Sequence, residues 1–250
     1  NYIPYPIETV YIDSQIVTPY RNHLDHLDVL LGALPRDTVD SYVNVIQKMG
    51  FIPQVLEIES LAVTRALMPS HAAPYPVMII DLGASRTNLI IFSGYTVRFT
   101  TSVPVASAAF SKAIQEGLGV SSAAAEEAKK KDGIAKKQDS QGEKVSEILN
   151  KPIKELLIQT KKYLDYYESH PSHQHLGKDK PAIKKIILCG GGSNLPGLVE
   201  FLASELKMEV MLGNPWENIL SSTPKNIPPL SFSDSIRFTT ALGLALRGMQ

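Results

Sequence analysis

The sequence contains a single cysteine, Cys189, among 250 residues. One cysteine cannot form an intrachain disulfide or supply a cysteine zinc cluster, so stability must come from a packed core. Basic and acidic residues also balance, at 25 each, which leaves no net charge. A neutral chain has no general electrostatic attraction to nucleic acid or to an anionic membrane. The composition therefore excludes a disulfide scaffold and a broadly basic nucleic-acid binder.

Long hydrophobic runs are missing as well, because no stretch approaches the roughly 20 apolar residues that span a bilayer. Residues 1–8 contain prolines and a glutamate where a signal peptide would have its apolar core. We expect any role at a membrane to go through a partner. With 44% hydrophobic residues, the chain can still bury a sizeable core in one large or two modest domains.

The most informative stretch is residues 77–92, where two apolar runs flank a polar turn. This pattern predicts two buried strands joined by a hairpin, with Asp81 at the end of the first. The turn residues with donor groups are Gly83, Ser85, Arg86, Thr87 and Asn88. Such donors can wrap phosphate oxygens while the carboxylate holds a hydrated divalent cation. A solvated hairpin capped by Asp81 is an equal alternative.

A second informative stretch, residues 190–197, lies between a predicted strand over residues 183–189 and a predicted helix over residues 198–207. Its glycines are Gly190, Gly191 and Gly192. They would let a ligand approach the backbone closely, with the helix N-terminus facing it. The stretch has neither the G-x-G-x-x-G dinucleotide spacing nor the Gly-Lys-Ser/Thr of a P-loop, which disfavours both families. A tight turn without a ligand is the alternative.

The remaining pattern predicts a small α/β subdomain over residues 1–58, a connecting helix and proline-rich linker over residues 59–76, and a second domain over residues 77–250. The small subdomain is expected to contain strands over residues 9–17, 28–34 and 51–58 and a helix over residues 36–49. The connecting helix is expected over residues 60–68, with Ser60 as its cap. The second domain is expected to add a strand over residues 96–104, a helix over 106–118, a helical insertion over about 119–180, a strand over 208–211 and a helix over 234–247.

Two histidine groups are candidate metal sites. His23 and His26 lie in a predicted loop near Asp25 and Asp28, and three more histidines fall within residues 168–180. Neither group includes a cysteine, and both lie in predicted loops. Solvated loops explain both groups better than metal binding does.

A strand–Asp-x-Gly–strand hairpin, a helical insertion and a strand–Gly-Gly-Gly–helix turn, in this order, resemble the second half of the actin-like (ribonuclease H-like) ATPase fold. The resemblance implies an α/β protein that clasps ATP or ADP with Mg²⁺. Asp81 would hold Mg²⁺ through water in a phosphate loop, and the three glycines would carry the adenosine. Glu126 and Lys129 resemble the Glu-x-x-Lys element that contacts ribose and adenine in these proteins. A surface ion pair one helical turn apart is an equally good explanation for these two residues.

The resemblance narrows to PilM, the cytoplasmic actin-like protein of type IV pilus machines, which is related to the division protein FtsA. The matching segments are residues 2–10, 37–50, 56–67, 81–88, 163–168 and 241–248. Glu59 matches the acidic residue that leads into the connecting helix. The resemblance implies a scaffold with at most weak ATPase activity, held at the inner face of the inner membrane by the N-terminal peptide of a PilN-like protein. Self-association is a further expected interaction, whereas nucleic acid is not an expected partner.

One departure from the family pattern concerns the start of the chain. Family members begin with a first phosphate hairpin, and no such segment precedes Asn1. We therefore expect an N-terminally incomplete fold with weakened nucleotide binding. Two other functions were weighed: an FtsA-like filament protein, which should carry a C-terminal amphipathic helix, and a sugar-kinase-like phosphotransferase, which would need a catalytic carboxylate in a substrate cleft.

Overall fold

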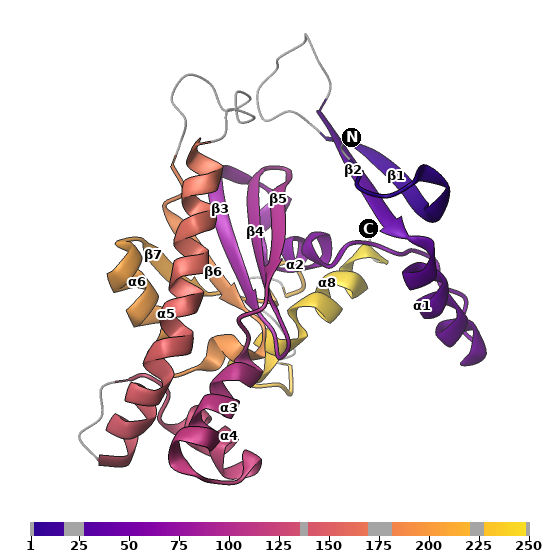
Figure 1. Cartoon of the computed structure of the whole chain (residues 1–250). Coiled ribbons are helices and arrows are strands. Elements are labelled where there is room, and N and C mark those ends of the chain that lie inside the picture. Colours follow the sequence, from indigo (N-terminus) through magenta and orange to yellow (C-terminus); the bar gives the residue numbers. More distant parts are fainter. Residues whose placement is uncertain (1–2, 18–27, 136–139, 170–181, 221–227, 249–250) are drawn as a thin grey trace. The chain divides into compact units, whose positions relative to one another are not determined.

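The computed structural model describes residues 3–17, 28–135, 140–169, 182–220 and 228–248 (Figure 1). The chain divides into two compact units, Asn1–Glu59 and Ser60–Gln250. His23, Asp25, His26 and the histidines within residues 168–180 lie outside the described residues, so the structure does not address the metal sites considered there.

The N-terminal unit consists of a hairpin and one helix. Strands β1 (Val10–Val17) and β2 (Asp28–Pro35) pair antiparallel, and α1 (Arg36–Lys48) follows directly, as predicted. Helix α1 is tied to β1 because the Tyr11 hydroxyl donates to Asp40 at 3.0 Å and the Arg36 guanidinium lies 4.2 Å from the Tyr11 ring centre. Burial is sparse, however, since the buried apolar side chains described here are Val10, Val17 and Val39.

The strand predicted over residues 51–58 is wrong. The structure has irregular backbone there, and Phe51, Ile52 and Val55 are all more than half exposed. An apolar run becomes a strand only when a neighbouring strand supplies hydrogen-bond partners, and β1 and β2 pair only with each other among the described residues. Pro53 also lacks the N–H that a ladder requires.

The C-terminal unit is built on a five-stranded sheet in the order β5-β4-β3-β6-β7. Strands β3 (Ala73–Leu82), β4 (Thr87–Gly94) and β5 (Thr96–Val103) form the predicted antiparallel meander. Strands β6 (Lys185–Cys189) and β7 (Glu209–Leu212) add on parallel to β3. Residues 73–76 were predicted to be linker, but they begin β3, and Ala73 is buried.

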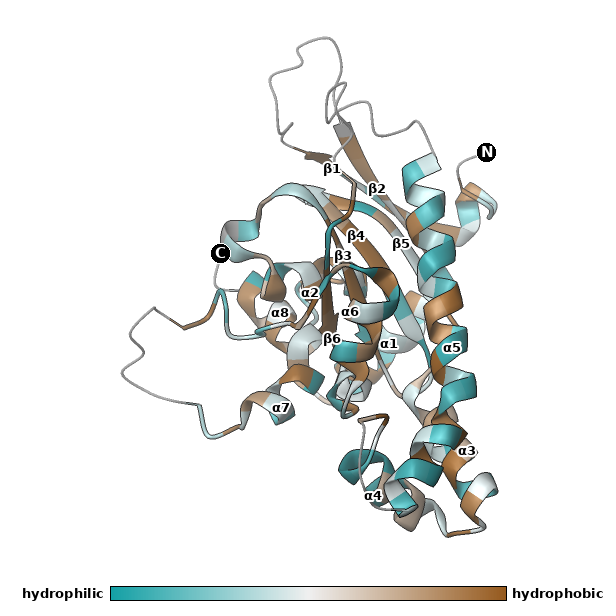
Figure 2. Ribbon diagram, turned by 90° about the vertical axis from the view of Figure 1, so that its left-hand side faces the viewer, coloured by the Kyte–Doolittle hydropathy of each residue, from teal (hydrophilic) through white to brown (hydrophobic). Residues whose placement is uncertain are grey.

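Helices cover both faces of this sheet, which explains why its central strands β3, β4 and β6 are largely apolar and buried. Along β3, Met78 and Ile80 face a core shared with α3 (Ser107–Leu118), α5 (Ser140–Ser169) and α6 (Leu198–Leu206). The alternate residues Val77 and Ile79 face a second core shared with α2 (Glu59–Leu67). Figure 2 shows β3, β4 and β6 as a hydrophobic centre between these layers. No described helix is both long enough and apolar enough to cross a membrane.

The predicted connecting helix corresponds to α2, which begins at Glu59, so Ser60 lies inside the helix and is not its cap. The predicted final helix over residues 234–247 is divided into α7 (Phe232–Ser235), a 3₁₀ turn at Ile236–Phe238 and α8 (Thr239–Arg247). The break has a physical reason. The Ile236 carbonyl accepts from the Gly190 backbone at 3.3 Å and from the Thr239 hydroxyl at 2.7 Å.

Candidate functional site

The sheet order brings the two informative turns to the same edge. Strands β3 and β6 are parallel neighbours, with Asp81 opposite Cys189. The turn after β3 and the glycine turn after β6 therefore emerge side by side, at the carboxyl ends of their strands, where α/β sheets commonly bind ligands. Their contact is close: a Cβ atom on Gly190 would lie 2.5 Å from the Asp81 Oδ1 atom.

The turn between β3 and β4 is held by its own backbone and by the segment that follows β5. The Gly83 N–H donates to the Arg86 carbonyl at 3.1 Å, which closes the turn. Asp81 is 8% exposed, and its Oδ2 atom accepts from the Asn88 amide at 3.4 Å. The Thr87 hydroxyl is buried and donates to the Val105 carbonyl at 2.6 Å, so this side chain anchors the turn. Ser85 is exposed at its tip.

The glycine turn fits its surroundings so tightly that two of its three glycines have no room for a side chain. Gly190 has a φ of +80°, and a Cβ on Gly192 would lie 2.6 Å from the Leu82 Cγ atom. Gly191 differs, because it is exposed and the nearest atom to an added Cβ is the Arg237 Cβ at 3.6 Å. Gly191 is therefore the glycine with space in front of it.

Helices α3 and α4 (Ser122–Lys131) close the site from the side, and each is tied to one of the turns. At the start of α3, the Ser107 and Ala108 N–H groups donate to the Gly83 and Ala84 carbonyls, both at 3.0 Å. Beyond the end of α4, the Ile134 N–H donates to the Pro196 carbonyl at 2.8 Å. The helices are thus positioned by backbone bonds to the same two turns that the sequence singled out.

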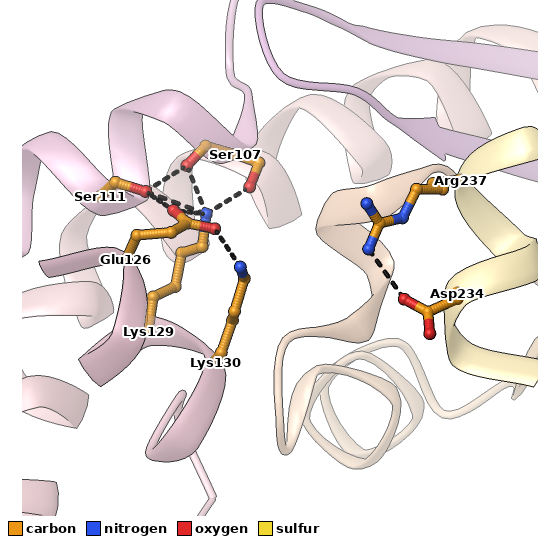
Figure 3. A network of polar contacts seen from close by, with 7 residues as sticks. All are labelled: Ser107, Ser111, Glu126, Lys129, Lys130, Asp234 and Arg237. Carbon is orange, nitrogen blue, oxygen red and sulfur yellow. Dashed lines mark hydrogen bonds and ion pairs between the residues drawn. The ribbon is translucent and has the colours of Figure 1, made fainter. Parts of the chain in front are cut away.

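Glu126 and Lys129, on α4, form an ion pair with 2.7 Å between Nζ and Oε2 (Figure 3). The Ser111 hydroxyl, from α3, donates to the same Oε2 atom at 2.6 Å. Burial of the Glu126 carboxyl raises its pKa, but hydrogen bonds from Lys129 and Ser111 and the charges of Lys129 and Lys130 outweigh burial and leave the pKa below its ordinary value. The carboxylate is therefore ionised at neutral pH.

A cleft of about 1330 Å³ opens between these elements. Of the predicted site residues, Gly191, Gly192, Glu126 and Lys129 line it, together with Ala84 of the first turn. On the side opposite the Glu126 network lies the ion pair of Arg237 with Asp234, at 2.8 Å (Figure 3). The predicted residues that are described but do not line the cleft are Asp81, Gly83, Ser85, Thr87, Asn88, Gly190 and Glu59.

Several cleft residues were missed by the sequence analysis, namely Ser107, Ser111, Lys130, Asn194, Asp234 and Arg237. Ser107 and Ser111 are four residues apart on a predicted helix directly after the meander, and that spacing was the available signal. Arg237 gave no such signal, because the contact that brings it beside the glycine turn is a hydrogen bond between the distant residues Gly190 and Ile236. Within the described residues, no three His, Cys, Asp or Glu side chains gather as a metal cluster.

A family described as type IV pilus assembly protein PilM matches this chain over residues 1–249. The chain belongs to the PilM family. Among solved structures, the chain is similar to a PilM-PilN type IV pilus biogenesis complex, with a TM-score of 0.76 and 24% identity over 100% of this chain and 69% of that chain.

The fold is shared more widely. MreB 5 of Spiroplasma citri bound to AMPPNP is similar with a TM-score of 0.62 and 16% identity, over 85% of this chain and 64% of that one. The ethanolamine utilization protein EutJ from Carboxydothermus hydrogenoformans is similar with a TM-score of 0.55 and 18% identity, over 81% of this chain and 59% of that one. At these identities the likeness concerns the fold, and the predicted actin-like α/β fold is confirmed.

Proposed function

We propose that this member of the PilM family is an ATP- and ADP-binding scaffold of type IV pilus assembly, and that the cleft in its C-terminal unit is the nucleotide site. The proposal depends on one observation: the two turns and the Glu126–Lys129 pair lie far apart in the sequence but meet around one cleft of about 1330 Å³. Pockets of roughly 300–1,000 Å³ enclose ligands of drug size, so the cleft has room for a nucleotide and its hydration.

Each part of the cleft suits one part of a nucleotide. The adenosine would lie against Gly191, where the backbone is exposed, and the ribose hydroxyls would donate to Glu126. The phosphates would lie at the turn after β3, whose tip carries backbone N–H groups and the exposed Ser85. The same fold in MreB 5 is described with bound AMPPNP, which supports the proposal by analogy.

Asp81 suits Mg²⁺ bound through water. Mg²⁺ keeps several waters and is commonly held by one or two carboxylates together with substrate phosphates. A single carboxylate, without a metal cluster in the described residues, fits a cation that arrives with the nucleotide. When bound, Mg²⁺ would neutralise phosphate charge.

We propose a role in conformation more than in turnover. The acidic side chains that line the cleft are Glu116, Glu126 and Asp234, and each has a cationic partner within 4 Å. A general base must take a proton from the water that it activates, and an ion-paired carboxylate is a weaker base than an unpaired one. We therefore expect weak ATPase activity at most.

We also propose that the N-terminal unit binds the N-terminal peptide of a PilN-like inner-membrane protein, which would hold this cytoplasmic protein at the membrane. Its two-stranded sheet has two edges and carries exposed apolar side chains, among them Ile12 and Ile16 on β1. A peptide can add as a strand to such an edge. The similar PilM-PilN complex supports this partner, and the family match favours pilus assembly over the FtsA-like alternative.

Calorimetry of Mg-ATP binding to the complete gene product tests the nucleotide site. Asp81→Ala should weaken Mg-ATP binding at least about tenfold, which corresponds to the loss of a charge-assisted contact of roughly 1.4 kcal/mol or more. The same substitution should change affinity for metal-free ATP much less. Equal Mg-ATP affinity of the variant and the unaltered protein would contradict the role of Asp81.

A further inference from the structure

Lys129 has no donor to spare for a ligand. Its ammonium nitrogen lies 2.7 Å from Glu126 Oε2, 2.8 Å from Ser107 Oγ, 2.9 Å from Ser111 Oγ and 3.4 Å from the Ser107 carbonyl. An ammonium group has three N–H donors, and these four acceptors are enough to engage all of them. The residue is also only 8% exposed, although it lines the cleft.

Glu126 is arranged differently. Its side chain is 39% exposed, compared with 10% for Lys129. Lys129 and the Ser111 hydroxyl both bind its Oε2 atom, whereas Oε1 lies 3.7 Å from the ammonium of Lys130, which is itself 70% exposed. The network thus holds Oε2 through two short contacts, whereas Oε1 is turned toward Lys130, on the side that faces Arg237 (Figure 3).

Ser107 connects this network to the turn after β3. Its side chain and carbonyl accept from Lys129, while its own N–H donates to the Gly83 carbonyl at 3.0 Å. A hydrogen-bonded chain therefore runs from the turn through Ser107 and Lys129 to Glu126. In a buried setting, such a chain restrains each member more than a single contact does.

We propose that Ser107, Ser111 and Lys129 are positioning residues that hold the Glu126 carboxylate in place to accept from the ribose hydroxyls of a ribonucleotide. The inference rests on the proposed nucleotide site, and it adds that the network around Glu126 makes this site prefer ribose over deoxyribose. It also changes the role expected for Lys129, which supports Glu126 and does not itself contact the nucleotide.

The sugar preference gives the test. Binding of Mg-ATP and of Mg-2′-deoxy-ATP to the complete gene product is measured by calorimetry, and the ratio of the two Kd values reports the use of the 2′-hydroxyl. The unaltered protein should bind ATP about tenfold or more tightly than 2′-deoxy-ATP, because the lost hydrogen bond is to a charged group. Ser111→Ala should reduce this ratio to less than about threefold, mainly by weakening ATP, because Glu126 loses its second anchor.

Three further variants make the result specific. Ser111→Thr keeps the hydroxyl and should restore the ratio. Ser41→Ala removes a helical serine hydroxyl that bonds the carbonyl four residues earlier, Asp37, in the N-terminal unit, and should leave the ratio unchanged. Lys129→Met removes the ammonium from beneath Glu126 and should lower the ratio as Ser111→Ala does. Melting curves identify any variant that fails to fold. If either Ser111→Ala or Lys129→Met fails to fold, the other of these two variants decides the inference.

The outcomes separate this inference from the proposed function. If the unaltered protein binds neither nucleotide, the proposed function and this inference both fall. If it binds ATP and 2′-deoxy-ATP equally, the nucleotide site stands and the inference is overturned. The inference is likewise overturned if Ser111→Ala and Lys129→Met weaken both nucleotides by the same factor or leave the ratio unchanged.

Discussion

Gly191 and Gly192 are adjacent in the chain, yet an added side chain meets different surroundings at the two positions. At Gly191 a Cβ has ordinary contact with Arg237 at 3.6 Å and enters the cleft. We expect Gly191→Val to keep a melting temperature close to that of the unaltered protein while ATP binding is lost, because the branched side chain occupies the adenosine position. Thermal denaturation beside calorimetry measures both quantities.

Gly192→Ala is the matched comparison. Here the Cβ would lie 2.6 Å from the Leu82 Cγ and 2.9 Å from both the Leu82 carbonyl oxygen and the Ser107 Cβ, so backbone must move. We expect a loss of roughly 1–3 kcal/mol in the free energy of unfolding. If Gly191→Val destabilises the fold more than Gly192→Ala does, the assignment of open space to Gly191 is contradicted.

The Glu126 carboxyl gives a pH prediction. Because its pKa is lowered in the folded chain, chiefly by Lys129 and Ser111 acting against burial, the ion pair is present above the ordinary carboxyl value and is lost as the pH falls through the folded pKa. A carboxyl-carbon NMR titration should find a Glu126 pKa below the ordinary glutamate value, and Lys129→Met should raise this pKa. A Glu126 pKa at or above the ordinary value, or one that Lys129→Met leaves unaltered, would contradict the network.

At the scale of elements, α2 and α8 cross at very short range. A Cβ on Gly243 would lie 1.8 Å from the Ala62 carbonyl oxygen, and the Arg65 guanidinium donates to the Gly243 carbonyl at 3.0 Å. Gly243→Ala should therefore force the helices apart and cost about 3 kcal/mol of unfolding free energy, measured by denaturant titration. Gly248→Ala, whose Cβ has a nearest contact of 3.6 Å, should be nearly neutral. Equal stability of the two variants would refute the close crossing.

The central strands were predictable because both faces of the sheet are covered, which leaves a continuous apolar run at β3, β4 and β6. The same reasoning failed for residues 51–58, where an apolar run was predicted to be a strand. The run is irregular because no neighbouring strand pairs with it among the described residues. The division of the final helix at Ile236 was not predictable for a similar reason. Its cause is a hydrogen bond from Gly190, a residue 46 positions earlier in the sequence.

The candidate site was predictable in its backbone and less so in its side chains. The two turns and the Glu126–Lys129 pair singled out in the sequence all reach the cleft. The turns meet there because β3 and β6 are parallel neighbours and end at the same edge of the sheet. Thr87, predicted to bind the nucleotide because of its hydroxyl, uses that hydroxyl to anchor the turn to Val105. Ser107 and Ser111 were overlooked because a small polar residue on a helix gains its role only from the neighbour that packs against it, here α4.

At the scale of the whole molecule, peptide binding and nucleotide binding are assigned to separate units. A fluorescent peptide from the N-terminus of the neighbouring PilN-like gene product should bind the complete protein. Ile16→Glu places a charge among the exposed apolar side chains of β1 and should weaken binding at least about tenfold, as expected for a charge placed in an apolar contact. Gln15→Glu adds the same charge at an exposed position on the other face of the same strand and is the control. Equal effects of the two substitutions, or no binding by the unaltered protein, would favour self-association as the role of this unit.

The central claim is that the cleft beside the glycine turn binds the nucleotide. The most direct measurement is a crystal structure of the complete gene product with Mg²⁺ and AMPPNP. The account predicts adenosine density against Gly191, a ribose hydroxyl within hydrogen-bond distance of Glu126, and the Lys129 ammonium still bound to Ser107 and Ser111. Nucleotide density at another surface, with this cleft unchanged, would contradict it.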